Sequence, residues 1–235
     1  GFIPWDDQHH LSLSQTNAEV DGRWLFANAN NTPRVARIDL KTFKTVEILE
    51  LPNSAGNHSS PFLTENTEYV VAGTRFAVPT DDANGDVPID SFKENFKGVL
   101  SFIGIDQQTG GMDLSFQIEA PGINFDLSHA GKKKSGDWFF FSCYNSEKAN
   151  TLLEVNASQN DKDFIMAVNW KKAAELVKAG KGRKVTTEYA HNTWDESTHS
   201  ATSTMKKEVV VLSVEDMKDA MFMIPCPKSP HGCDV

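Results

Sequence analysis

The sequence has 235 residues, of which 39% are hydrophobic, 10% aromatic and 23% charged, and its formal net charge is -9 at pH 7. This length allows one large domain or two small ones. The negative charge argues against non-specific binding to nucleic acid or anionic lipid, and no apolar run reaches the length of a membrane span. The first residue is not Met and no signal peptide precedes the first strand-like segment, so we expect a mature or partial chain.

The stretch 5–10 contains the adjacent histidines His9 and His10, with Asp7 two residues before the first. Successive side chains of an extended strand leave opposite faces, so the two rings share a task only where the backbone turns or around a large cluster. Imidazole without thiolate suits zinc, copper, iron or nickel. Asp7 could orient one ring through its second nitrogen. The alternative is a solvated turn.

Short segments with strand character follow, separated by turns rich in Asn, Gly and Asp. We expect strands at residues 23–27, 34–39, 45–49, 68–78, 99–105, 114–118, 137–143, 164–170 and 208–214. One amphipathic helix is predicted at 171–179, ended by Gly180. Residues 185–204 are polar and are expected to lie between elements. No interdomain linker is visible, so the sequence predicts an all-β protein with minor helix.

A short unit occurs twice in the sequence. A strand runs into Asp39-x-x-Thr42 and a further strand follows; the same order recurs around Asp106-x-x-Thr109. Repeated short antiparallel units are typical of propeller blades. The spacing exceeds one blade, and the loop-like segment 79–97 supplies the required insertion. The pattern therefore predicts a partial propeller.

Further polar residues could carry chemistry, although each has a simpler explanation on its own. His58 lies in a turn of small residues and His231 lies between Pro230 and Gly232, so both are either ligands or solvated loop histidines. Asp126 lies at the end of an apolar stretch. It either orients a metal ligand from the outer shell or lies in a solvated turn. The oxygens of Tyr144 and Glu147 suit calcium or cap a turn.

The three cysteines have no zinc-type spacing. Cys143 is expected to be buried and inert, because it ends an aromatic strand. Cys226 and Cys233 could form a disulfide in an oxidising compartment.

Four segments taken together resemble nitrous oxide reductase. They are Asp7-x-His9-His10, residues 21–26 with 34–39, residues 143–148, and residues 227–232. Their order and approximate spacing agree with that family over nearly the whole chain.

The resemblance implies a periplasmic head-to-tail homodimer that reduces nitrous oxide in denitrification. In the family, a seven-bladed N-terminal propeller binds a tetranuclear copper-sulfide cluster through seven histidines, and a C-terminal cupredoxin domain with a dinuclear copper site receives electrons. The donors are small c-type cytochromes or cupredoxins. Residues 1–235 would form the first part of the propeller.

The resemblance assigns roles to individual residues. His9, His10, His58 and His231 match the first four copper-cluster ligands, and Asp7 and Asp126 match outer-shell acids. Tyr144, Glu147 and Asp163 match ligands of a structural calcium ion.

The sequence also departs from the family. His129, His191 and His199 match no ligand, and the other three cluster ligands would lie beyond Val235. Ser229 stands where the family has an asparagine ligand for calcium, and the family's calcium-ligand methionine has no counterpart near residues 152–157. These two differences argue against the calcium site. The stretch after His58 also differs from the commonest form of the family, which indicates a divergent branch.

Two other hypotheses about function compete with the hypothesis that the chain is a fragment of a copper oxidoreductase. One is a non-catalytic propeller used for binding, in which the histidines are bystanders. The other is a mononuclear metal hydrolase, which needs a nearby carboxylate base and an open coordination position. Copper in the protein would favour the first reading, zinc the hydrolase, and no metal the binding module.

Overall fold

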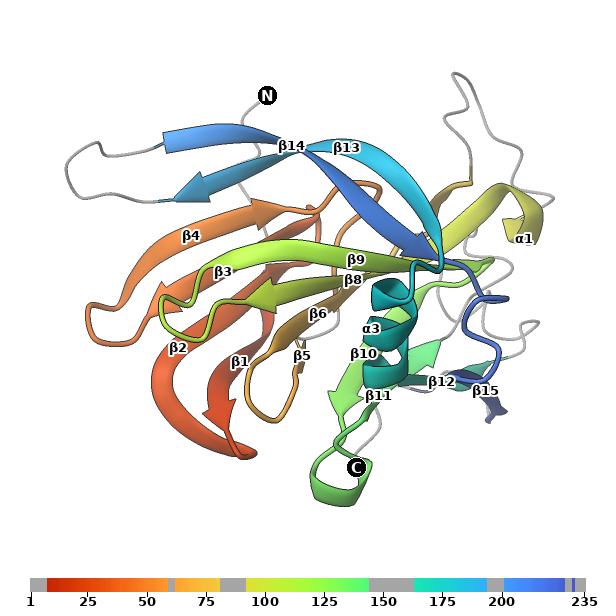
Figure 1. Ribbon diagram of the computed structural model, residues 1–235, viewed down its shortest axis with the longest axis horizontal. Coiled ribbons are helices and arrows are strands. Elements are labelled where there is room, and N and C mark those ends of the chain that lie inside the picture. Colours follow the sequence, from red (N-terminus) through yellow and green to blue (C-terminus); the bar gives the residue numbers. More distant parts are fainter. Residues whose placement is uncertain are drawn as a thin grey trace.

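The computed structural model describes residues 8–58, 62–80, 92–143, 163–193, 201–226 and 230. Within these ranges the strands form one eleven-stranded sheet and one four-stranded sheet, with little helix. The prediction of an all-β protein is confirmed. Figure 1 shows the larger sheet strongly curled around the molecule.

The strands fall into three successive antiparallel meanders of four. The first contains β1 (Gln8–Thr16), β2 (Glu19–Ala29), β3 (Arg34–Asp39) and β4 (Lys44–Glu50). The second contains β5 (Phe62–Leu63), β6 (Tyr69–Gly73), β8 (Phe96–Ile105) and β9 (Met112–Pro121), with β7 (Val78–Pro79) also paired to β8. The third contains β10 (Phe125–Ala130), β11 (Trp138–Cys143), β12 (Phe164–Asn169) and β15 (Met221–Pro225). This repeated order is that of propeller blades.

The repeated sequence unit forms the same turn in the first two meanders. Oδ1 of Asp39 accepts hydrogen bonds from the backbone N–H and the hydroxyl of Thr42 between β3 and β4. Oδ1 of Asp106 accepts the same two bonds from Thr109 between β8 and β9. Both turns join the third and fourth strands of a meander, so the repeat predicted from the sequence is confirmed.

The middle meander is buried on both faces. Val71 and Phe102 belong to a core shared with the third meander, whereas Val70 and Ile103 belong to a core shared with the first. Consecutive strand residues therefore point into different cores, as the two-residue period of a strand requires. This explains the nearly continuous apolar sequence of β6 and β8.

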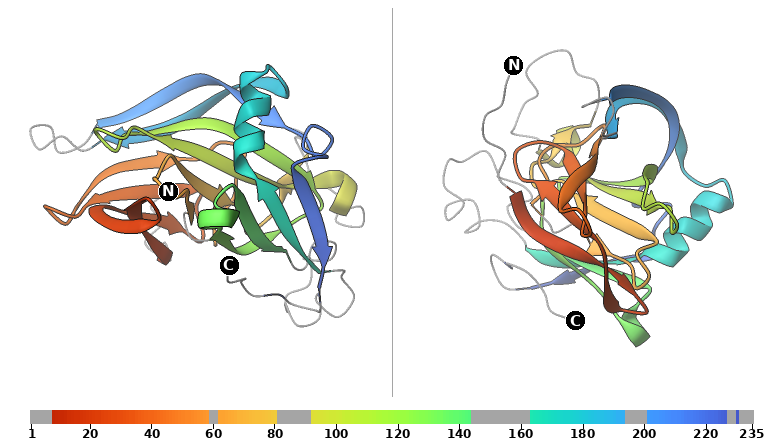
Figure 2. Two further views of the ribbon diagram at one scale, coloured as in Figure 1. Left: turned by 60° about the horizontal axis from the view of Figure 1, so that its bottom comes forward. Right: turned by 90° about the vertical axis from the view of Figure 1, so that its left-hand side faces the viewer.

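The third meander is interrupted between β12 and β15. The insertion contains α3 (Trp170–Lys178), β13 (Arg183–Thr193) and β14 (Ala201–Leu212). β13 pairs antiparallel with β4, and β14 pairs parallel with β9, so this hairpin bridges the outer strands of the first two meanders. Figures 1 and 2 show it lying along both strands.

The expectation that residues 185–204 lie between elements is wrong, because β13 and β14 cover most of them. The sequence there is polar because nearly all of the described residues in this range are at least partly exposed. The expected strand 68–78 is also divided into β6 and β7. β1, β5, β10 and β15 were not among the expected strands.

The helix is confirmed at α3, where the Asn169 side chain accepts a hydrogen bond from the backbone N–H of Lys172 and Gly180 follows with a φ of 77°. Two shorter helices are α1 (Phe92–Asn95) and the 3-10 turn η2 (Lys133–Ser135).

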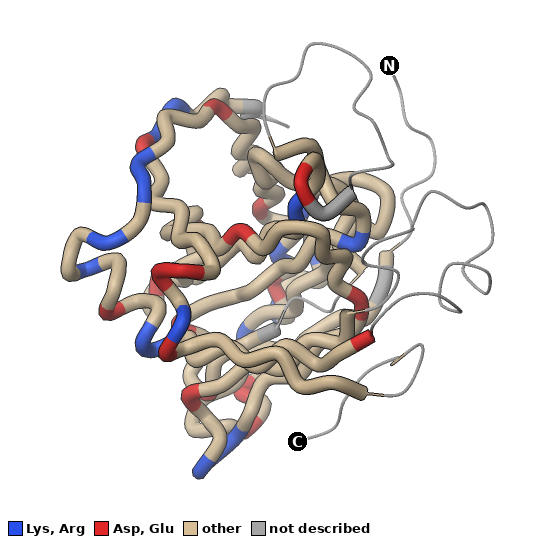
Figure 3. Tube along the Cα trace, turned by 90° about the vertical axis from the view of Figure 1, so that its right-hand side faces the viewer, with Lys and Arg blue, Asp and Glu red and all other residues tan. Residues whose placement is uncertain are grey.

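In the described ranges, no helix is long and apolar enough to cross a membrane. Figure 3 shows Lys and Arg interspersed with Asp and Glu along the trace.

Candidate metal site

Three of the candidate ligands and one candidate outer-shell acid lie near the first strands of the three meanders. His9 and His10 belong to β1, His58 stands a few residues before β5, and Asp126 belongs to β10. β5 contacts both β1 and β10. Residues that are far apart in the sequence therefore meet along the inner edge of the stacked meanders.

His58 and Asp126 form a buried hydrogen-bonded pair, with residue exposures of only 6% and 1%. Nδ1 of His58 donates to Oδ1 of Asp126. The proton on Nδ1 leaves the lone pair of Nε2 available to a metal ion, which is how a carboxylate commonly orients a histidine ligand. Asp126 is thus buried and hydrogen-bonded, and not solvated.

His10 approaches the same pair from the first meander. The pairing of β1 with β2 is irregular between His9 and Ser12, and His10 has a φ of 47°. This turn in the backbone brings the ring of His10 to a centroid distance of 5.3 Å from the ring of His58, at an interplanar angle of 80°. The backbone irregularity that adjacent histidine ligands need is therefore present.

Main-chain hydrogen bonds fix the segment that carries His58. Asn57 forms an isolated bridge with Thr74, which directly follows β6. The carbonyl of Thr74 also accepts from the backbone N–H of Phe125 at 2.9 Å, one residue before Asp126. Thr74 therefore holds the main chain on both sides of the His58–Asp126 pair, and sequence reasoning did not identify it.

The rings of His10 and His58 lie edge-to-face, and one of them is hydrogen-bonded to a carboxylate. Imidazole nitrogens are ligands that suit copper and zinc, so the chemistry of these residues fits a metal held by histidines. Among the described side chains, no group of three or more His, Cys, Asp or Glu is arranged to hold a metal ion. Asp7, His231 and the side chain of His9 lie outside the described part.

Of the proposed calcium ligands, Tyr144 and Glu147 lie outside the described residues. Asp163 is buried just before β12, and its carbonyl accepts from the backbone N–H of Cys226 at 3.2 Å. Burial, and then the charge of Asp163, raise the pKa of the Cys226 thiol. Cys233 lies outside the described residues, and Cys143 is buried as expected.

The histidines without an assigned role are placed differently. Nε2 of His191 is hydrogen-bonded to Oε1 of Glu47 at 2.6 Å, where β13 meets β4, so this histidine joins two strands. His129 is on β10, opposite Phe140 of β11. His199 lies outside the described residues.

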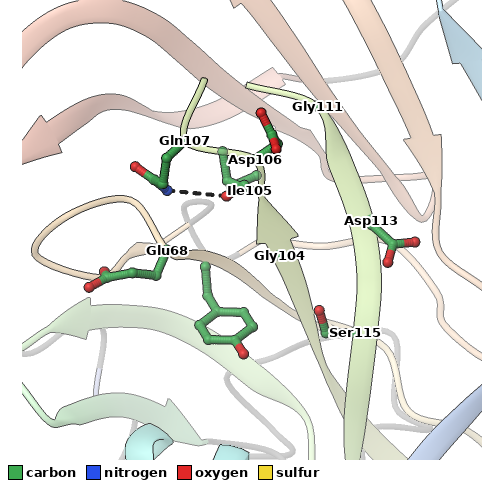
Figure 4. Close-up of a pocket in the computed structure, with 9 residues that line it drawn as sticks. Glu68, Gly104, Ile105, Asp106, Gln107, Gly111, Asp113 and Ser115 are labelled. Atoms are coloured by element: carbon green, nitrogen blue, oxygen red, sulfur yellow. Dashed lines mark hydrogen bonds between the residues drawn. The ribbon is translucent and has the colours of Figure 1, made fainter. Parts of the chain in front are cut away.

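A shallow acidic pocket lies toward the start of β6, where Glu68, Asp106 and Asp113 line it (Figure 4). Each carboxylate already has a partner in the protein. Glu68 accepts from Asn66, Asp106 from its own turn, and Asp113 pairs with Lys207. The pocket is separate from the histidines, which meet beyond the other end of β6.

No protein-family model matches the chain. The chain is 32% identical over 232 residues to nitrous-oxide reductase of Pseudomonas fluorescens, and 29% identical over 232 residues to that of Stutzerimonas stutzeri. A third relative, the nitrous-oxide reductase of Ralstonia nicotianae, is 26% identical over 242 residues. Each match covers 97% of this chain.

The chain spans about one third of the length of these relatives, 32% for the first two and 33% for the third. Among solved structures, the β-propeller domain of Cps50 (Swd1) from Myceliophteria thermophila matches with a TM-score of 0.37 and 12% identity. That match covers 89% of this chain and 59% of the other.

Proposed function

We propose that the chain forms the first blades of a propeller that binds a copper-sulfide cluster, because it is a divergent relative of nitrous-oxide reductases and matches about one third of their length. The whole protein then reduces nitrous oxide. The observation that carries this proposal is the meeting of His10 and His58 at the inner edge of the meanders, with Asp126 orienting His58.

When bound, a multinuclear copper-sulfide cluster delivers two electrons to nitrous oxide, which with two protons gives dinitrogen and water. The proposed ligands in this chain are His9, His10, His58 and His231. Their role is to hold copper with neutral imidazole nitrogens, and no nucleophile is required.

Asp126 acts through the histidines. The resemblance assigns the same kind of role to Asp7. Asp126 fixes the Nδ1 proton of His58 and thereby the direction in which Nε2 points. Its negative charge also lies close to a cationic site in a buried environment, where the attraction between charges is weakly screened.

The same proposal includes the rest of the protein, its location, its electron donor and calcium, each by analogy with the family. The other ligands and the cupredoxin domain come from parts of the protein outside these 235 residues. The protein is a periplasmic homodimer that takes electrons from a c-type cytochrome or a cupredoxin. Tyr144, Glu147 and Asp163 bind calcium.

The test uses the full-length protein that contains this sequence, produced with copper. Copper content, the absorption spectrum and the formation of dinitrogen from nitrous oxide are measured for the wild type and for His58→Ala. The matched control is His129→Ala, which removes an imidazole from the same strand as Asp126. We expect copper and turnover to be lost with His58→Ala and kept with His129→Ala.

Three results contradict the proposal. Zinc in place of copper in the wild type indicates a hydrolase, and a protein without metal indicates a binding module. Turnover by His58→Ala at the wild-type rate removes this residue from the ligand set and overturns the assignment.

A further inference from the structure

The last two residues of β2 contact both histidine-bearing segments. Asn28 lies opposite His9 in the pairing of β1 with β2. Its side chain is fully buried, and its Nδ2 donates to the backbone carbonyl of Asn57 at 2.7 Å. The backbone N–H of Asn57 in turn donates to the carbonyl of Ala29 at 2.9 Å. The peptide groups beside His58 are thus tied to the strand that pairs with His9.

The same segment is held from its other side by the second meander. The backbone N–H of Arg75 donates to the carbonyl of Gly56 at 2.8 Å, and Thr74 bridges Asn57. Gly56 also packs closely on the first meander, because a Cβ placed there would lie 1.8 Å from the carbonyl oxygen of Asn30. The main chain before His58 therefore fits between two meanders with no space to shift.

Among the contacts named above, the hydrogen bond from the Asn28 amide is the one that a side chain makes, and it runs from the first meander to the His58 segment. The amide of Asn28 belongs to β2, and the carbonyl that it reaches belongs to residue 57. Such a bond in a buried environment is strong, and its loss leaves an acceptor that water cannot readily reach. The Asn28 amide is therefore suited to set the separation between the β1 histidines and His58.

We propose that Asn28 is a positioning residue of the copper site, which fixes His58 relative to His9 and His10. The proposal rests on the copper-binding function proposed above. Asn28 acts through the main chain of Asn57 and is not itself a ligand. Loss of an interaction that orients a ligand typically lowers metal affinity by about 10- to 100-fold.

The test compares Asn28→Asp with Asn53→Asp in the copper-loaded full-length protein. Asn28→Asp has nearly the same shape but places a carboxylate oxygen against the Asn57 carbonyl in place of the donor. Asn53 is the matched control, because its Nδ2 donates to Glu119 at 2.8 Å from an exposed position on the same connection between β4 and β5. The measurements are copper affinity against a competing chelator, the absorption and paramagnetic resonance spectra of the bound copper, and circular dichroism.

We expect Asn28→Asp to bind copper about 10- to 100-fold more weakly and with changed spectra, while its circular dichroism is unchanged. Asn53→Asp should match the wild type in all measurements. Asn28→Ala removes the donor without adding charge and serves as the second variant if the aspartate variant does not fold.

The outcomes separate this inference from the proposed function. Wild-type protein without copper overturns the proposed function. Wild-type protein with copper, and both Asn28 variants with unchanged affinity and spectra, overturns the role of Asn28 alone. If neither variant folds, Asn28 serves the fold as a whole and the positioning role is also wrong.

Discussion

Asp126 accepts a hydrogen bond from His58, a residue 68 positions earlier, and this contact joins the second and third meanders at a buried point. Asp126→Asn keeps an oxygen that can accept the Nδ1 proton but removes the charge. We predict a folded protein whose copper affinity falls by about 10- to 100-fold. A chelator competition assay measures this, with the half-buried Asp137→Asn as control. Unchanged affinity in Asp126→Asn would show that the charge of Asp126 does not contribute to copper binding.

The buried carboxylate of Glu47 joins three strands. It accepts from Nε2 of His191 at 2.6 Å, from the backbone N–H of Met112 at 2.9 Å and from Nε of Arg37 at 3.0 Å. Burial raises the pKa of Glu47, but the hydrogen bonds from His191 and Met112 and the charge of Arg37 outweigh it, so the pKa is lowered below 4.5. A lowered pKa means that the ionised group stabilises the fold above the unfolded-state pKa, and that this contribution is lost as the pH falls through the folded-state pKa.

We therefore predict that Glu47→Gln lowers the free energy of unfolding by about 3 kcal/mol at pH 7, because the buried Arg37 guanidinium loses its counter-charge. The difference from the wild type should shrink as the pH falls below 4.5. Urea unfolding at a series of pH values measures it, with Glu188→Gln on the exposed face of β13 as control. A difference that stays constant from pH 7 into the acid range contradicts the ionised role of Glu47.

The close approach of Gly56 to Asn30 predicts a second effect. A Cβ at this position would lie 1.8 Å from a main-chain oxygen, so Gly56→Ala forces the backbone before His58 to move. We expect a loss of about 1–3 kcal/mol in stability together with weaker copper binding. Gly111→Ala is the matched control, because its nearest contact is the Thr109 hydroxyl at 3.3 Å. Equal stability of the two variants in urea would show that the gap between the meanders can widen freely.

The hydroxyl of Tyr189 is buried and has no hydrogen-bond partner within the described part of the chain. Burial, and then the charge of Asp113, raise its pKa to about 12. A buried hydroxyl without a partner costs free energy, so Tyr189→Phe should leave stability unchanged or increase it by up to about 1 kcal/mol. The midpoint of thermal unfolding measures this. A clearly lower midpoint would mean that the hydroxyl has a stabilising contact.

Local sequence was sufficient to predict the turns of the first two meanders. The Asp39 and Asp106 side chains bond to residues only two and three positions later, so the whole interaction is contained in a short motif. α3 was predictable for the same reason, since its amphipathic pattern and terminal Gly180 are adjacent in the chain. The formation of these turns and of α3 depends little on contacts with the rest of the fold.

The hairpin of β13 and β14 was not predictable in this way. Its residues pair with β4 and β9, which lie far away in the sequence, and its polar composition resembles that of a loop. The meeting of His10 and His58 likewise depends on how the meanders stack. The resemblance identified those histidines, but nothing local to them indicated the contributions of Asn28 and Thr74.

The third meander closes late, because β15 reaches β12 only after the chain has passed through α3 and the hairpin. During synthesis the first two meanders therefore emerge with the outer edges of β4 and β9 bare, and exposed strand edges recruit other chains. The arrival of β13 and β14 covers part of both edges, because residues 191–193 pair with β4 and residues 210–212 pair with β9. We therefore expect the hairpin to limit aggregation through these edges, and its long-range pairing to slow folding.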